Sequence, residues 1–188
     1  MRAMLLDNAK EAIAAELAKS FGSFPAILRK WSQAQPDALA IVDDTRDVAW
    51  AELIGEVERL AARLIETGLE PGQSVAILGT SSVNYALVFL AAIRAGGVAA
   101  PLTTSASPEQ LEGMARDSGA RHLFIDDAKA AELGQDFLAQ MIRIPLEGIE
   151  TWMAPPGSLA PDIEPASGDP FNIIYSISGI RNTIYNQI

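Results

Sequence analysis

Residues 68–102 read GLEPGQSVAILGTSSVNYALVFLAAIRAGGVAAPL. The apolar run at 74–78 predicts a buried strand of a parallel sheet, because such a strand is covered on both faces and needs no polar alternation. Residues 83–95 are apolar on most sides, which predicts a buried helix ended by the glycine pair at 96–97. A short apolar run at 98–100 follows. Strand, helix and strand joined by short loops are typical of the crossover unit of a parallel sheet.

The same alternation of helices and strands continues on both sides of this stretch. Upstream, the pattern predicts helices at 8–20, 25–32 and 53–64, and a β-hairpin with strands at 39–42 and 48–50. Downstream, it predicts a helix at 107–118 that starts with a capping box of Ser107 and Gln110, a short helix at 128–133, and strands at 122–125, 141–144 and 171–175. We therefore expect an α/β fold with a mostly parallel sheet flanked by helices.

Composition suggests four parts of the chain. An N-terminal helical segment at 1–22 precedes an α/β subdomain at 23–154. Five prolines at positions 155, 156, 161, 165 and 170 mark residues 155–170 as an exposed linker or surface loop. Residues 171–188 hold the last predicted strand and a short tail.

Charge and hydropathy narrow the classes of function. The 188 residues carry a formal net charge of −10, which disfavours binding to nucleic acid or to anionic membranes. The chain has no cysteine, which excludes disulfides, thiolate metal sites and cysteine nucleophiles. The longest apolar run, at 85–93, is far shorter than the roughly 20 residues that span a bilayer. We expect a soluble cytoplasmic protein without membrane insertion.

Residues that usually carry catalysis are sparse. His122 is the only histidine and lies in an apolar run, which favours a packed strand residue over a metal ligand or a member of a catalytic triad. The acidic pairs at 43–44, 126–127 and at Glu147 and Glu150 flank turns or helix starts, where carboxylates commonly cap. We therefore predict no catalytic residue and no metal site.

Two loops that follow strands are candidates for anion binding. Residues 79–82, GTSS, lead from a strand into a helix, so their hydroxyls either hold an anion or act as ordinary N-caps, and N-capping is the favoured interpretation. Residues 174–179, IYSISG, place small hydroxyl residues and a glycine directly after an apolar strand, as many phosphate loops do. The glycine pair at 96–97 follows a helix and precedes a strand, the reverse of a phosphate loop.

Several fragments in fixed order resemble the N-terminal region of the acyl-adenylate-forming superfamily, which includes acyl-CoA synthetases, peptide-synthetase adenylation domains and luciferases. The fragments are VAWAEL at 48–53, GLEPGQSVAIL at 68–78, AIRAGGVAAPL at 92–102, and SPEQL at 107–111 with DSGA at 117–120. Their counterparts in the family are T-Y-x-E-L, G-V-x-x-G-D-x-V-A-I, R-A-G-A-V-x-x-P-L and E-L…D-S-x-A. The resemblance implies a truncated N-terminal subdomain of such an enzyme.

The family's phosphate loop, Y-S-S-G-T-T-G-x-P-K-G, is only partly matched. Residues 169–176 lead into it, and with Ile177 treated as an insertion the candidate cofactor-binding residues are Ser176, Ser178, Gly179 and Thr183. The second glycine and the lysine of the motif are replaced by Asn182 and Tyr185. The substitutions remove a residue that permits close backbone approach and a cation that holds phosphates.

The resemblance implies the N-terminal fragment of an AMP-forming acid–thiol ligase. The intact enzyme would use ATP and Mg to adenylate a carboxylic acid, release pyrophosphate and transfer the acyl group to CoA. We expect this chain alone to be inactive and to bind no cofactor.

Two other hypotheses remain: a non-catalytic α/β module that binds a nucleotide or a partner, and a flavodoxin-like domain with FMN at residues 79–82. An exposed sheet edge also predicts a homo-oligomer.

Overall fold

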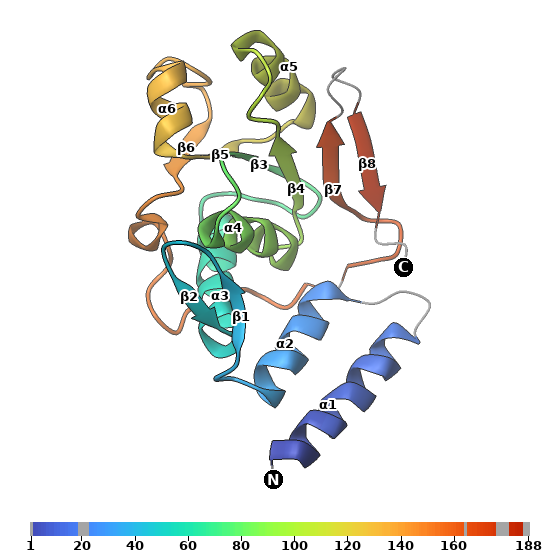
Figure 1. Cartoon of the computed structure of the whole chain (residues 1–188). Coiled ribbons are helices and arrows are strands. Elements are labelled where there is room, and N and C mark those ends of the chain that lie inside the picture. The colour runs from blue at the N-terminus through green and yellow to red at the C-terminus, as the bar shows by residue number, and fades with distance from the viewer. Residues whose placement is uncertain (1, 19–22, 164, 176–180, 186–188) are drawn as a thin grey trace.

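A computed structural model describes residues 2–18, 23–163, 165–175 and 181–185, which form an α/β fold (Figure 1). The helices are α1 (Arg2–Leu17), α2 (Phe24–Ala34), α3 (Trp50–Glu66), α4 (Val83–Arg94), α5 (Pro108–Ser118), α6 (Asp127–Leu133) and the 3₁₀ turn η1 (Ile149–Thr151). The strands are β1 (Leu39–Val42), β2 (Asp47–Ala49), β3 (Ser74–Leu78), β4 (Val98–Leu102), β5 (His122–Ile125), β6 (Ile142–Pro145), β7 (Pro170–Tyr175) and β8 (Arg181–Tyr185).

The main sheet has the strand order β6-β5-β3-β4-β7-β8. The strands β3 to β7 pair in parallel, and β8 pairs antiparallel with β7. From β3 the chain crosses to β4 on one side and then returns past β3 to β5 on the other side. Right-handed crossovers in opposite directions place their helices on opposite faces. Accordingly, α3 and α4 cover one face of the sheet, and α5 and α6 cover the other (Figure 1). The predicted fold class is confirmed.

Two apolar cores lie on the two faces of β3, which is buried along its whole length. Val75 and Ile77 belong to the core beneath α3 and α4, whereas Ala76 and Leu78 belong to the core beneath α5. Successive side chains of a strand point to opposite faces, so an unbroken apolar run supplies both cores. This explains why residues 74–78 predict the centre of the sheet.

Helix starts follow the local capping signals. Ser23 accepts a hydrogen bond from the N–H of Ala26 at the start of α2, and the predicted capping box at the start of α5 is present. Gly119 ends α5 in the left-handed conformation, with φ of 69°, which glycine adopts without steric cost.

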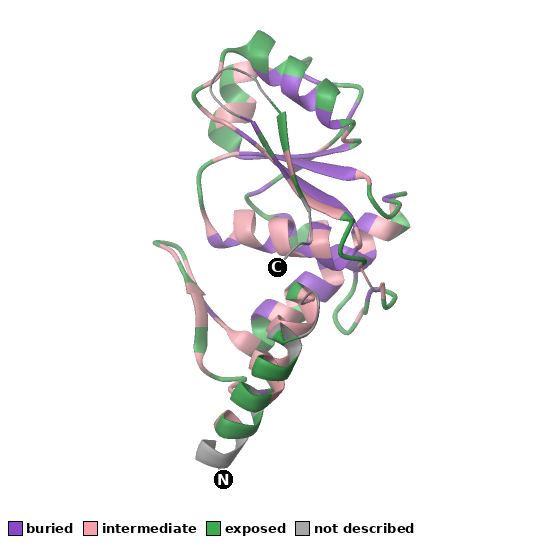
Figure 2. Cartoon of the chain, turned by 90° about the vertical axis from the view of Figure 1, so that its right-hand side faces the viewer, coloured by how far each residue is buried: buried purple, intermediate pink, exposed green. Residues whose placement is uncertain are grey.

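The N-terminal elements lie apart from the main sheet. α1 and α2 pack against each other, and the two-stranded sheet β1–β2 lies beside α2 and α3 (Figures 1 and 2). Trp31 of α2 stacks on Trp50 at the start of α3, with ring centroids 6.4 Å apart. The first helix runs from Arg2 to Leu17 and therefore begins earlier and ends sooner than the predicted range 8–20.

Strand β8 was not predicted, because residues after 175 were assigned to a phosphate-loop tail. The segment RNTIY pairs with β7 in an antiparallel ladder that sets Ile173 opposite Thr183 and Tyr175 opposite Arg181, with a register shift between Pro170 and Asn172. Threonine, isoleucine and tyrosine favour strands, so this composition was a usable signal.

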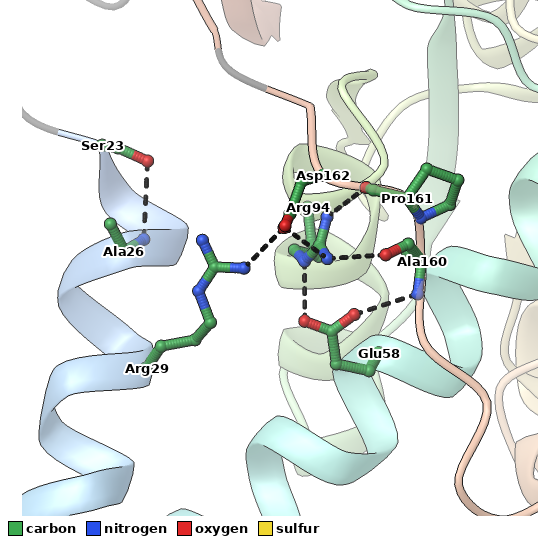
Figure 3. Close-up of polar contacts among 8 residues, drawn as sticks. All are labelled: Ser23, Ala26, Arg29, Glu58, Arg94, Ala160, Pro161 and Asp162. Carbon is green, nitrogen blue, oxygen red and sulfur yellow. Dashed lines mark hydrogen bonds and ion pairs between the residues drawn. The ribbon is translucent and has the colours of Figure 1, made fainter.

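A buried ion pair anchors the proline-rich segment (Figure 3). Arg94 of α4 donates from Nε to Glu58 of α3 at 2.7 Å, and both side chains are less than one tenth exposed. The other guanidinium nitrogens donate to the carbonyl oxygens of Pro161 and Ala160, at 2.8 and 2.9 Å. The second carboxylate oxygen of Glu58 accepts the N–H of Ala160 at 3.1 Å. The segment is therefore held across α3 and α4.

His122 lies at the start of β5 and is fully buried. Its Nε2 is 2.9 Å from the hydroxyl oxygen of Thr67, and its ring meets Trp152 edge-on. Burial lowers the pKa of His122, and the positive charge of Arg121 lowers it further. The packed-residue interpretation agrees with this environment.

We predict that Arg94→Met reduces the free energy of unfolding by about 3–5 kcal/mol, because it leaves the buried Glu58 carboxylate without its cation. The double variant Glu58→Met/Arg94→Met should lose less than the sum of the two single variants. Arg29→Met is the control: its ion pair with Asp162 is largely exposed and should contribute less than about 1 kcal/mol. Urea unfolding is measured for the unsubstituted chain, Glu58→Met, Arg94→Met, the double variant and Arg29→Met. Equal losses for Arg94→Met and Arg29→Met would contradict the prediction.

We also predict that stability decreases as the pH falls below 6.5, the ordinary histidine value. The unfolded chain binds a proton at His122 in this range, whereas the folded chain, with its lowered pKa, does not. Protonation therefore favours the unfolded state. Since His122 is the only histidine, the slope just below pH 6.5, above the range in which carboxyl groups titrate, should vanish in His122→Gln. Urea unfolding at a series of pH values around 6.5 provides the test. A free energy of unfolding of the unsubstituted chain that does not change below pH 6.5 would rule the effect out.

Candidate functional site

Loops that follow the parallel strands gather at one edge of the sheet. In open α/β sheets, ligands bind outside the carboxyl ends of the strands, where the strand order reverses. Here the reversal lies at β3, whose neighbours are β4 and β5. A hollow of about 330 Å³ lies at this point, between the β1–β2 turn and the loops that follow β3, β5 and β6.

The carboxylates around this hollow already accept backbone hydrogen bonds. Asp126 accepts the N–H of Thr80 at 2.8 Å with one oxygen and the N–H of Lys129 at 2.7 Å with the other. Asp43, from the β1–β2 turn, accepts the N–H of Val83 at 2.7 Å. Each bond joins a loop to a neighbouring element. The loops around the hollow are therefore held together by the carboxylates of Asp43 and Asp126.

Asp43 keeps a negative charge at the start of α4. Its pKa lies well below the usual range, because the hydroxyl of Thr45 and then the N–H of Val83 donate to its carboxylate. Ser82 caps the same helix by accepting the N–H of Tyr85. The start of a helix attracts anions, and at α4 the carboxylate of Asp43 is the anion that lies there. Among residues 79–82, Ser82 thus acts as the N-cap, and the N–H of Thr80 is taken up by Asp126. The carboxylates that line the hollow disfavour a phosphate there.

Carboxylates also bind backbone groups at the start of α6. Glu147 accepts the N–H of Asp127 at 3.0 Å, and Asp126 is the N-cap of α6. Within the described ranges, no group of three or more histidine, aspartate or glutamate side chains is arranged to hold a metal ion. In the same part of the chain, no helix is both long and apolar enough to cross a membrane.

A second group of polar residues lies where β7 ends and β8 begins. Tyr175 donates its hydroxyl hydrogen to Asp117 at 2.9 Å, and Arg181 donates from Nη1 to the carbonyl oxygen of Asp117 at 3.1 Å. Burial raises the pKa of Tyr175 above its ordinary value, and the hydrogen bond with Asp117 raises it further. The side chain of Arg181 is 42% exposed. Because Arg181 is the first residue of β8, it places a cation where β8 begins.

Hydroxyl residues after β4 lie at the same edge. β4 is the parallel neighbour of β7, and the segment after it reads Thr103-Thr104-Ser105. The hydroxyl oxygens of Thr103 and Ser105 are 3.0 Å apart. Sequence reasoning overlooked these residues, although a hydroxyl cluster directly after an apolar strand is the signal that drew attention to residues 79–82.

The predicted cofactor-binding residues are only partly described. Ser176, Ser178 and Gly179 lie outside the described residues. Thr183 lies in β8, where its hydroxyl oxygen accepts a hydrogen bond from Nε of Arg181 at 3.3 Å. Its neighbour in the ladder, Ile173, is buried. The structure thus places Thr183 in a strand, because the ladder with β7 begins immediately after residue 180.

Comparison with known proteins identifies the family. The family model of the AMP-binding enzymes matches residues 28–179, most of the chain. The chain belongs to the AMP-binding enzyme family. A non-canonical nonribosomal peptide synthetase from Salinispora arenicola, CymA, is 30% identical over 61% of this chain and 2% of its own length. The D-alanine–D-alanyl carrier protein ligase of Bacillus licheniformis is 26% identical over 82% of this chain and 30% of its own length.

The fold agrees with the family. The crystal structure of the N-terminal domain of FACL13 from Mycobacterium tuberculosis superposes with a TM-score of 0.74 at 20% identity, covering 86% of this chain and 43% of that domain. The chain thus spans less than half of each of these three relatives. Membership of the AMP-binding family confirms the resemblance to adenylate-forming enzymes and removes the flavodoxin-like hypothesis, although the two folds share a reversal of strand order.

We predict that Gly79→Ala reduces the free energy of unfolding by about 1–3 kcal/mol, because added atoms overpack a closed junction. A Cβ at this position would lie 2.8 Å from a side-chain carbon of Leu146 and 3.0 Å from Oδ2 of Asp126. Gly113→Ala within α5 is the matched control, since its Cβ would meet no atom within 4 Å. Gly113→Ala should raise the free energy of unfolding by roughly 0.5–1 kcal/mol, because alanine has a higher helix propensity than glycine. Thermal or urea unfolding tests both, and a neutral Gly79→Ala would show that the junction is loose.

Proposed function

We propose that this chain is the N-terminal portion of an adenylate-forming ligase. The observation that carries the proposal is the family match, which extends to residue 179, into the β7–β8 connection at the carboxyl edge of the sheet. The complete enzyme activates a carboxylic acid with Mg-ATP. ATP supplies the adenylyl group that joins the carboxylate, and pyrophosphate leaves.

The residues at the carboxyl edge of β4 and β7 fit a phosphate in part. The hydroxyls of Thr103 and Ser105 can donate to phosphate oxygens, and Arg181 provides a cation. Arg181 already contacts Asp117, so a phosphate would compete with that carbonyl and carboxylate. Ser176, Ser178, Gly179 and Thr183 remain the proposed loop residues.

Magnesium that accompanies ATP is usually bound by one or two carboxylates together with the substrate phosphates. The described residues hold no group of three or more histidine, aspartate or glutamate side chains that would bind it without ATP. The chain spans 43% of the FACL13 domain, so more than half of that domain has no counterpart here. For this reason we propose that the chain by itself does not catalyse adenylation.

We propose CoA as the thiol acceptor of the complete enzyme, as the sequence motifs imply. A carrier protein is the second candidate. It is supported by the relative from Bacillus licheniformis, whose name gives a D-alanyl carrier protein as its acceptor. A non-catalytic module is the remaining alternative for the chain as it stands, and nucleotide binding without turnover would support it.

We predict that the purified chain releases no pyrophosphate above a protein-free blank when it is incubated with Mg-ATP and a panel of carboxylic acids. The reason is that more than half of the FACL13 domain on which this chain superposes has no counterpart in it. An intact D-alanine–D-alanyl carrier protein ligase assayed with D-alanine is the positive control. Release above the blank that disappears in Arg181→Gln would overturn the prediction and assign the activity to this edge.

A further inference from the structure

An apolar groove adjoins the hollow at the reversal of strand order. It has a volume of about 380 Å³, its walls come from α2, β1, α3 and α4, and every residue that lines it is aliphatic or aromatic. Ile41 lines the groove, and Asp43, two residues further along the chain, lines the hollow. Tyr85 and Asn84, which are neighbours at the start of α4, divide between the two in the same way. Groove and hollow therefore form one surface with an apolar part and a polar part.

The polar part of this surface is negatively charged. The residues that line the hollow include four carboxylates and no lysine, arginine or histidine. The four are Asp43, Asp44, Asp126 and Glu147. Within the described residues, none of them forms an ion pair. A partner that covers both parts is therefore complementary if it combines an apolar surface with positive charge.

The walls of the groove have the shape that receives a helix. Phe24 and Leu28 lie four residues apart on α2, and Tyr85 and Phe89 lie four residues apart on α4. Side chains at this spacing form a ridge along one face of a helix, and helices pack by placing the ridge of one into the groove of another. Amphipathic helices bind apolar grooves in this way, through anchors at positions i, i+3 or i+4, and i+7.

We propose that the groove and the hollow together bind an amphipathic helix of a partner protein. Its apolar face would lie against Phe24, Tyr85 and Phe89, and lysine or arginine side chains at one end of it would reach the carboxylates of the hollow. Exposed apolar patches of soluble proteins commonly serve such contacts. The proposal does not rest on the proposed function, because it involves neither Arg181 nor the β7–β8 connection.

The charge of the hollow disfavours three other occupants. A fatty acid that lay in the groove would bring its carboxylate towards four others. A second copy of the chain, related by a twofold axis through the groove, would bring the two hollows and their carboxylates towards each other. An anionic membrane would be repelled by the same charges.

A peptide selection tests the chemistry of the partner. A displayed library of helical peptides of about 18 residues, with leucine fixed at positions i, i+4, i+7 and i+11 and all other positions random, is selected on the full 188-residue chain. The enriched peptides should carry two or more lysine or arginine residues in the turn beyond one end of the leucine stripe. A selection that enriches no peptide, or that enriches peptides without these basic residues, overturns the proposal.

A charge reversal locates the basic end of the enriched peptides. Asp44 lines the hollow and is exposed, so Asp44→Lys should weaken peptide binding by about tenfold without unfolding the chain. Glu112→Lys makes the same change of charge at an exposed residue of α5, across the main sheet from α4, and should leave the affinity within about twofold. Fluorescence anisotropy of a labelled peptide measures all three proteins. Equal weakening by the two variants would mean that only net charge attracts the peptide, which contradicts the proposal.

A thiol placed in the groove locates the apolar face. The chain has no cysteine, so Ala86→Cys introduces a single thiol in the groove, and Ala131→Cys introduces one at an exposed residue of α6. A saturating amount of an enriched peptide should slow maleimide labelling of Ala86→Cys by about tenfold or more and leave Ala131→Cys unchanged, because the bound helix covers only the groove. Labelling of Ala86→Cys that the peptide does not slow overturns the proposal, whatever the effect of Asp44→Lys.

The same thiol reports the other occupants. Protection of Ala86→Cys in the chain alone that rises with the concentration of the chain would assign the groove to a second copy. Protection by palmitate would assign it to a fatty acid, and protection by phosphatidylcholine vesicles would assign it to a membrane surface. Each of these three results overturns the proposal.

Discussion

The ion pair between Glu58 and Arg94 is the contact on which the course of the chain depends. Two charges with little access to water must satisfy each other and their remaining hydrogen-bonding groups. They do so with the backbone of residues 160–161, which ties that segment to α3 and α4. From this segment the chain continues to β7, which pairs with β4 and with β8.

Carboxylates decide which loops at the sheet edge can accept an anion. At the reversal of strand order, Asp43 and Asp126 take up the N–H groups of the β3–α4 loop and of the start of α4. After β4 the polar groups include the hydroxyls of Thr103 and Ser105, and at the start of β8 the side chain of Arg181 lies beside Asp117. The two parts of the sheet edge therefore differ in the charge and the hydrogen-bonding groups that they present.

The two faces of the main sheet are covered by different helices. The α5–α6 face is covered by helices that cap themselves and bury one core. The opposite face is covered by α3 and α4, which bury the other core.

Short-range patterns were enough to predict most helices and strands, because an apolar run, a capping serine or a glycine acts within a few residues. The centre of the sheet at 74–78 and the capping box at Ser107 are examples. Strand order, the pairing of Glu58 with Arg94 and the contact of Thr67 with His122 were decided only by the tertiary structure. Those contacts join residues 36 and 55 positions apart, and no local pattern encodes which distant partner will satisfy a buried polar group. Strand β8 lies between these cases, since its residues favour a strand but only pairing with β7 establishes one.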